Sequence, residues 1–157
     1  MEGNGMPVAA KGSRLRKGRH SQTMSIYLLT VVTHDRRPAF ADWRSARLLV
    51  EQLRAADEAE IATSMAWVVM PDHLHWLLQL QSGSLAELVC RIKSRSSRSI
   101  NLMRGEQGRL WQRGYYDRAL RRDEDLKAAA RYIIMNPLRA GLVDRVGDYP
   151  LWDAIWV

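Results

Sequence analysis

The chain has 157 residues, but only one cysteine and no long apolar run. Because Cys90 has no partner in the chain, an internal disulfide is excluded, and with four histidines a closed zinc site of the finger type is hard to assemble. No apolar run approaches the about 20 residues that span a bilayer, and residues 1–5 lack the apolar core of a secretory signal. We therefore expect a cytoplasmic protein with no membrane partner, in which Cys90 is a buried thiol on an apolar helical stripe.

Acidic residues are also few: 17 Asp and Glu stand against 24 Lys and Arg, for a formal net charge of +7. Such an excess favours a polyanionic partner and, for a cytoplasmic protein, association with the nucleoid. We expect residues 1–22 to form a basic flexible arm and residues 23–157 a single catalytic domain. The candidate DNA-binding residues come from three basic clusters: Arg14, Arg16, Lys17, Arg19, Arg91, Lys93, Arg95, Arg98, Arg113 and Arg118.

Hydrophobic periodicity predicts strands that alternate with helices. The strands are expected at 25–33, 61–70, 73–81 and 110–120, and the helices at 42–59, 84–104 and 123–136. Asp123 is the expected cap of the last helix, and Pro137 its expected end. The order β-α-β-β-α-β-α predicts an α+β fold, a ferredoxin-like split β-α-β sandwich whose antiparallel sheet carries an added C-terminal helix.

The segment His73-Leu74-His75 is the first candidate for chemistry, because a strand sends alternate side chains to the same face and so sets two imidazoles side by side. The alternative is a pair of hydrogen-bonded core histidines. On the last predicted helix, Tyr132 and Asn136 are four residues apart and share a face; their alternatives are core packing and a helix cap. Two imidazoles and an amide oxygen make three ligands for a divalent ion, and a tyrosine hydroxyl can form a phosphotyrosine intermediate.

The other aromatic residues have less specific interpretations. Tyr115 and Tyr116 are neighbours on a predicted strand, so they point to opposite faces, and we assign them to packing or base stacking. The remaining candidates are expected in the core: Tyr27, Trp67, Trp76 and Trp111.

Four stretches together resemble the REP-associated tyrosine transposases, a group of the single-tyrosine HUH transposases. They are YLLTVVT at 27–33, VVMPDHLH at 68–75, LWQRGYYDRALR at 110–121 and RYIIMNPLRAGLV at 131–143. The resemblance implies that His73, His75 and Asn136 are ligands of Mg²⁺ or Mn²⁺, and that Tyr132 is the nucleophile that becomes joined to a 5′ phosphate. It also implies that single-stranded or hairpin DNA of repetitive extragenic palindromes is the partner, and that a monomer completes the site, with a dimer as the alternative.

The sequence therefore predicts a metal-dependent single-strand DNA endonuclease and strand transferase. A non-catalytic protein that binds nucleic-acid hairpins is the alternative from another class, and a metal hydrolase that uses water is a third. The sequence leaves open the recognised DNA, the native metal and whether the protein still mobilises DNA.

Overall fold

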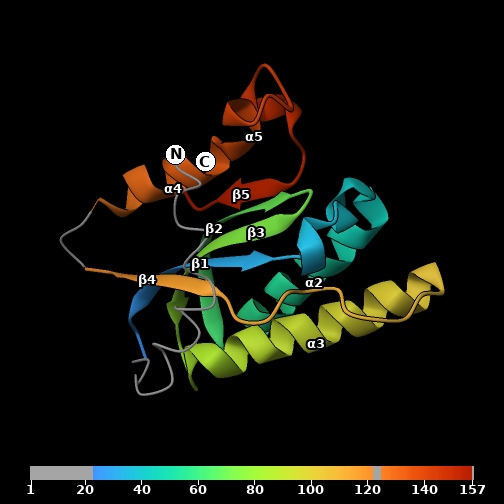
Figure 1. Ribbon diagram of the computed structural model, residues 1–157. Helices are drawn as coiled ribbons and strands as arrows, with labels where there is room; N and C mark the ends of the chain where they lie inside the picture. The colour runs from blue at the N-terminus through green and yellow to red at the C-terminus, as the bar shows by residue number, and fades with distance from the viewer. Residues whose placement is uncertain (1–22, 122–124, 157) are drawn as a thin grey trace.

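A computed structural model describes residues 23–121 and 125–156, and shows a five-stranded antiparallel sheet between two layers of helices (Figure 1). The strands are β1 (Ile26–Val32), β2 (Ala62–Met70), β3 (His73–Leu80), β4 (Tyr116–Leu120) and β5 (Trp152–Ala154). The helices are α2 (Trp43–Glu58), α3 (Leu85–Arg104), α4 (Leu126–Ile134) and α5 (Asn136–Arg139), with the short 3-10 helices η3 (His34–Arg36), η4 (Ala39–Ala41) and η5 (Val146–Asp148). In the described ranges, no helix combines the length and the apolar character needed to cross a bilayer.

The strand order β4-β1-β3-β2-β5 and the antiparallel pairing confirm the predicted α+β, ferredoxin-like arrangement. β2 and β3 form a hairpin through the turn at Pro71 and Asp72, and β1 lies between β3 and β4. The sequence analysis did not predict β5, a three-residue strand that pairs with the outer edge of β2.

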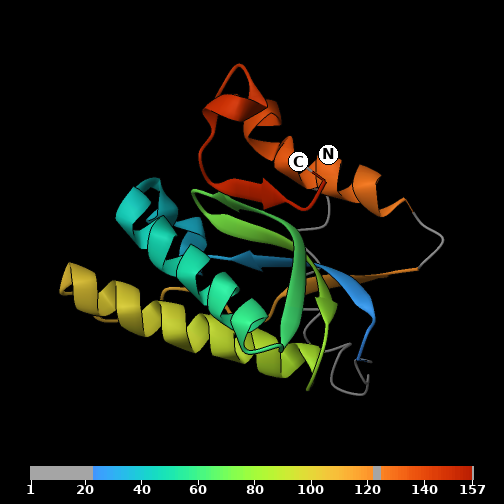
Figure 2. The ribbon, with the colours of Figure 1, turned by 180° about the vertical axis from the view of Figure 1, so that it is seen from behind.

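Each face of the sheet carries its own apolar core, and among the described residues the two cores have no member in common. Leu74 and Trp76 of β3 pack with α2 and α3 on one face. Leu77 of β3 packs with Ala130 and Ile133 of α4 on the other face. Seen from behind, α2 and α3 lie together on one side of the sheet and α4 lies on the other (Figure 2). Because side chains alternate along a strand, His73 and His75 belong to the α4 face.

The predicted core aromatics are confirmed, since Tyr27, Trp67, Trp76 and Trp111 are all buried. The prediction for Cys90 is wrong, because its side chain is exposed. The buried stripe of α3 includes Leu88, Val89 and Ile92, and the next position after Val89 turns a further 100° around the helix, toward solvent.

The fourth predicted strand is shorter than expected. Only Tyr116–Leu120 form β4, and Trp111 makes an isolated bridge to Thr33. Gly114 has a φ of 77°, a left-handed conformation that interrupts the strand. The carbonyl groups of Gln112 and Gly114 instead accept hydrogen bonds from the Lys93 ammonium of α3, at 2.8 and 2.7 Å.

The last predicted helix differs at both ends. Its cap is Asp125, whose side chain accepts a hydrogen bond from the Ala128 N–H, whereas Asp123 lies outside the described residues. The helix ends at Ile134, and after Met135 a second short helix, α5, begins with Asn136 and Pro137. Pro137 therefore starts a helix rather than stopping one, because proline fits the first turn, where its missing N–H has no intrahelical partner to lose.

Candidate active site

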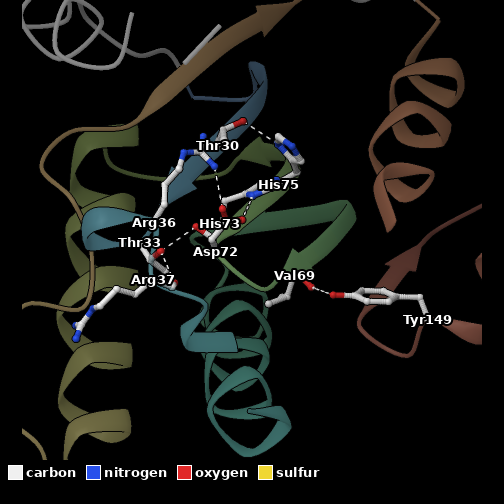
Figure 3. A network of polar contacts seen from close by, with 9 residues as sticks. All are labelled: Thr30, Thr33, Arg36, Arg37, Val69, Asp72, His73, His75 and Tyr149. Atoms are coloured by element: carbon white, nitrogen blue, oxygen red, sulfur yellow. Dashed lines mark hydrogen bonds and ion pairs between the residues drawn. The ribbon is translucent and has the colours of Figure 1, made fainter. Parts of the chain in front are cut away.

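The two histidines of β3 lie side by side on the α4 face of the sheet. Their ring centroids are 4.7 Å apart and the ring planes meet at 77° (Figure 3). Leu74, between them in sequence, is fully buried in the core with α2 and α3 and so anchors the strand from behind. The alternation predicted from the sequence is therefore present.

Each imidazole is oriented by a hydrogen bond at its Nδ1 atom. The His73 Nδ1 lies 2.7 Å from Asp72 Oδ1, and the His75 Nδ1 lies 2.8 Å from Thr30 Oγ1 on the neighbouring strand β1. A partner at Nδ1 fixes the ring and leaves Nε2 as the nitrogen for a metal, which is the usual arrangement of metal-binding histidines.

Asp72 is itself held on three sides. Its second carboxylate oxygen accepts a 2.9 Å hydrogen bond from Arg36 Nη1, and its backbone carbonyl accepts bonds from both the amide and the hydroxyl of the buried Thr33. The hydrogen bond from His73, together with Arg36, lowers the pKa of Asp72 to about 2 even though partial burial opposes this. The carboxylate is thus ionised and aimed at His73.

The turn that presents Arg36 is strained. Asp35 and Arg36 have φ values of 54° and 50°, a left-handed conformation that is unfavourable for residues with a Cβ. Such backbone persists only when its surroundings enforce it. Here the second of the two strained residues, Arg36, forms the ion pair with Asp72.

His75 is kept neutral by its surroundings. Burial lowers its pKa to about 3, and the charges of His73 and Arg139 act in the same direction. Since only the neutral imidazole has a lone pair for a metal, His75 is in its ligand form over the physiological pH range.

Tyr132 and Asn136 lie on either side of the break between α4 and α5. The Tyr132 side chain is 50% exposed, and the guanidinium carbon of Arg139 lies 4.0 Å from the centroid of its ring. The positive charge of Arg139 also contributes to the lowered pKa of His75. Asn136 is the half-buried first residue of α5.

The side chains near the histidines supply only part of the ligand set of a divalent ion. Within residues 23–121 and 125–156, no group of three or more His, Cys, Asp or Glu side chains could hold a metal. Asp72 is engaged by His73 and Arg36, so the protein ligands to be expected are two imidazole nitrogens and an oxygen from another residue type, such as an amide. Phosphate oxygens of a substrate complete such open sites.

The predicted DNA-binding residues separate into groups. Arg14, Arg16, Lys17 and Arg19 lie outside the described residues. Arg91, Lys93, Arg95 and Arg98 belong to α3, on the sheet face opposite the histidines, and Lys93 is half-buried against the segment before β4. Arg113 is exposed in the turn before β4, and Arg118 is exposed on β4 itself.

Four residues of the site were missed by the sequence analysis: Thr30, Arg36, Asp72 and Arg139. Asp72 stands next to His73 in sequence, so an oriented histidine was a readable signal there. Thr30 is recognisable only from the β1–β3 register, in which it is opposite His75.

The sequence profile of the family described as "Transposase IS200 like" matches residues 21–136. This chain belongs to the IS200-like transposase family. Two curated relatives carry the REP-associated tyrosine transposase description. A Haemophilus influenzae protein assigned to that group is 26% identical over 141 residues, which cover 80% of this chain and 77% of the relative. The REP-associated tyrosine transposase of Escherichia coli is 30% identical over 87 residues, 54% of this chain and 50% of the relative.

Two solved structures share the fold of this IS200-like transposase. A REP-associated tyrosine transposase bound to a REP hairpin has a TM-score of 0.71 and 24% sequence identity, over 85% of this chain and 79% of that one. A transposase-type protein from Deinococcus radiodurans has a TM-score of 0.53 and 26% identity, over 76% of this chain and 95% of that one. The resemblance to the REP-associated group is confirmed, and a transposase family assigns this chain a function on DNA.

Proposed function

We propose that this IS200-like transposase is a metal-dependent single-strand DNA endonuclease and strand transferase that works through a covalent 5′-phosphotyrosine. The observation that carries the proposal is the pair of oriented imidazoles on β3, which lie on the sheet face that is covered by α4, the helix that carries the half-exposed Tyr132. Tyr132 would be the nucleophile.

His73 and His75 would hold Mg²⁺ or Mn²⁺, with Asn136 as a third ligand. The bound ion would supply Lewis-acid polarisation of a phosphodiester oxygen. Asp72 and Thr30 would keep the two rings in the orientation that presents Nε2.

In the first step, the Tyr132 hydroxyl oxygen attacks the scissile phosphorus and the bond from phosphorus to the 3′ oxygen breaks. The phenol proton ends on the departing 3′ oxygen, so the products are a tyrosyl 5′-phosphate and a free 3′ hydroxyl. Attack by a 3′ hydroxyl of another strand then rejoins the DNA and returns the proton to Tyr132. Arg139, over the tyrosine ring, would neutralise charge on the phosphate as it is transferred.

The DNA partner would be single-stranded DNA that folds into a hairpin. Support comes from the family match and from the solved structure of a REP-associated tyrosine transposase bound to a REP hairpin. Because α4, which carries Tyr132, packs against β2 and β3 of its own chain on the face of the histidines, we propose that one chain completes the site and that a monomer is the active form.

The test is a hairpin oligonucleotide labelled at its 3′ end, incubated with the protein and Mn²⁺ and analysed on a denaturing protein gel. We expect a labelled protein band that EDTA abolishes and that Tyr132→Phe lacks, while Tyr132→Phe still binds the hairpin. Tyr149→Phe, which alters a phenol that is bonded to the Val69 carbonyl, is the matched control and should keep the band. Cleavage without a protein band would indicate a water-using hydrolase, and hairpin binding without cleavage in any divalent metal would indicate a non-catalytic binding protein.

A further inference from the structure

The register of the sheet places a second tyrosine on the same face as the histidines. Tyr116 of β4 is opposite Thr30 of β1, and Thr30 is opposite His75 of β3. Directly opposed residues on antiparallel strands share a face, and the hydrogen bond between Thr30 and His75 confirms that these two do. One row of side chains therefore runs from Tyr116 through Thr30 to His75.

The next row of the sheet brings a positive charge to the same face. Arg118 is opposite Leu28 of β1, and Leu120, two residues further, packs in the α4-side core. Asp117 alternates to the other face, so the only acidic residue of β4 points away from this row. Tyr116 and Arg118 are separated by about 7 Å along the strand, as two residues of an extended chain are.

Helix α4 covers this face unevenly. Its main contacts are with β2, β3 and β5, where Val68 and Leu77 are fully buried. On β1, by contrast, Leu28 and Thr30 are only half-buried within the described part of the chain. Tyr116 is half-buried and Arg118 is exposed. We call the surface formed by Leu28, Thr30, Tyr116 and Arg118 the β1–β4 ledge.

We propose that the β1–β4 ledge holds the unpaired DNA strand next to the scissile phosphate, with a base stacked on Tyr116 and a phosphate bound by Arg118. This inference rests on the proposed function. An aromatic ring beside a cation is the combination that binds single strands without reading their sequence. The ledge is continuous with the histidines through Thr30, so a strand lying on it leads directly into the site.

The arginines of α3 are poor candidates for this role, although they are more numerous. Arg95 and Arg98 are exposed on a helix that packs against the opposite face of the sheet. A strand bound there could reach His75 only by passing around the edge of the sheet. Arg95→Gln is therefore a matched control for Arg118→Gln, since it removes the same charge from α3, on the opposite face of the sheet.

The experiment uses the full chain carrying Tyr132→Phe, so that binding is measured without cleavage. Fluorescence anisotropy of an unpaired oligonucleotide gives the affinity, and a copy containing 5-iodouracil is cross-linked with ultraviolet light and mapped by peptide mass spectrometry. We expect Tyr116→Leu to weaken binding roughly 5- to 150-fold, as loss of one stacked base does. Arg118→Gln should lower the slope of log affinity against log salt by about 0.7, and Arg95→Gln should leave both quantities unchanged.

A cross-link on the peptide that contains Tyr116 would support the ledge. Cross-links confined to α3, equal losses in Arg95→Gln and Arg118→Gln, unchanged affinity in Tyr116→Leu, or no binding of the unpaired strand would each overturn it. These readouts need no cleavage, so the ledge can fail while Tyr132 still forms its DNA adduct, and the reverse result is equally distinguishable.

Discussion

At the scale of single residues, the proposed metal site depends on a chain of hydrogen bonds that runs from Arg36 through Asp72 to His73. Arg36 neutralises the carboxylate on one oxygen, and the other oxygen holds the histidine Nδ1 at 2.7 Å. A carboxylate behind a histidine orients the ring and raises its strength as a ligand. The strained turn at Asp35 and Arg36 suits a residue whose position matters more than its local stability.

Asp72→Asn tests this unit. The substitution keeps the size of the side chain but removes the charge, so we expect roughly 10- to 100-fold weaker binding of Mn²⁺. Isothermal titration of the protein with Mn²⁺ alone measures it. Asp35→Asn is the control, because it removes an exposed charge nearby and asparagine tolerates a left-handed backbone. Equal affinities for Asp72→Asn and the unchanged protein would show that Asp72 does not support a metal ligand.

At this scale the sequence predicts residue types better than partners. Alternation along a strand was enough to pair His73 with His75, because that rule is local. Thr30 and Arg139 are 45 and 64 positions from His75 in the chain, so their contacts depend on register and helix docking. The prediction for Cys90 failed for a related reason: an apolar stripe has an edge, and one residue past it faces solvent.

At the scale of elements, the segment after α5 closes the open side of β2. β5 pairs with β2, and the Val69 amide donates to the Leu151 carbonyl. The Tyr149 hydroxyl donates a 2.6 Å hydrogen bond to the Val69 carbonyl, and these groups lie together in Figure 3. This closure supports the strand that carries α4, and therefore Tyr132, on its surface.

Tyr149→Phe tests the closure through its pH dependence. Burial raises the pKa of Tyr149 to about 12, above the value of about 10 in an unfolded chain. Between these values the unfolded chain has lost the proton and the folded chain has kept it, so the free energy of unfolding falls as pH rises through this window. Below it, the full contribution of the hydrogen bond is present.

We therefore expect Tyr149→Phe to lower the free energy of unfolding by about 1 kcal/mol at pH 8. The difference from the unchanged protein should shrink at pH 11, because the tyrosine loses its advantage there. Urea unfolding followed by circular dichroism at both pH values measures this, with Tyr132→Phe as a half-exposed control. A difference that stays constant from pH 8 to pH 11 would contradict the assigned role of the buried phenol.

The order of elements was predictable because each has a local signal: runs rich in apolar and β-branched residues for β1 and β2, an apolar run with polar histidines at alternate positions for β3, and the capping box at Ser84 for α3. Their ends were less so. Gly114 and Lys93 together shorten β4, and Met135 divides what reads as a single amphipathic helix. β5 has three residues, too few to show a period, and it exists because the edge of β2 offers a partner.

At the scale of the whole molecule, the two faces of the sheet have different tasks. The face with α2 and α3 holds the larger core, and the face with α4 holds the histidines, Tyr132 and the β1–β4 ledge. The fold could be predicted from the sequence, but the face on which each basic cluster lies could not. A helical wheel shows that α3 has a basic side without showing which side of the sheet the helix covers.

The arm that the sequence predicts for residues 1–22 gives a prediction at this scale. Replacing Arg14, Arg16, Lys17 and Arg19 with glutamine removes four charges from the full chain. If all four contact phosphates of a hairpin, the slope of log affinity against log salt should decrease by about 3. The midpoint of thermal unfolding should not change, since both cores of the described part of the chain are built by residues 26–154. The comparison variant combines Arg95→Gln and Arg98→Gln on α3. An unchanged slope in the variant with four glutamines would show that these four residues do not bind DNA.

The central claim is that Tyr132 becomes covalently joined to DNA. Its most direct test is to digest the protein–DNA adduct with a nuclease and a protease, and to identify the modified residue by mass spectrometry. The proposal predicts a nucleotide that is joined through its 5′ phosphate to the phenolic oxygen of Tyr132, in the peptide from α4. A nucleotide joined to Tyr116, another tyrosine on the histidine face, or no modified tyrosine despite cleavage, would contradict the account.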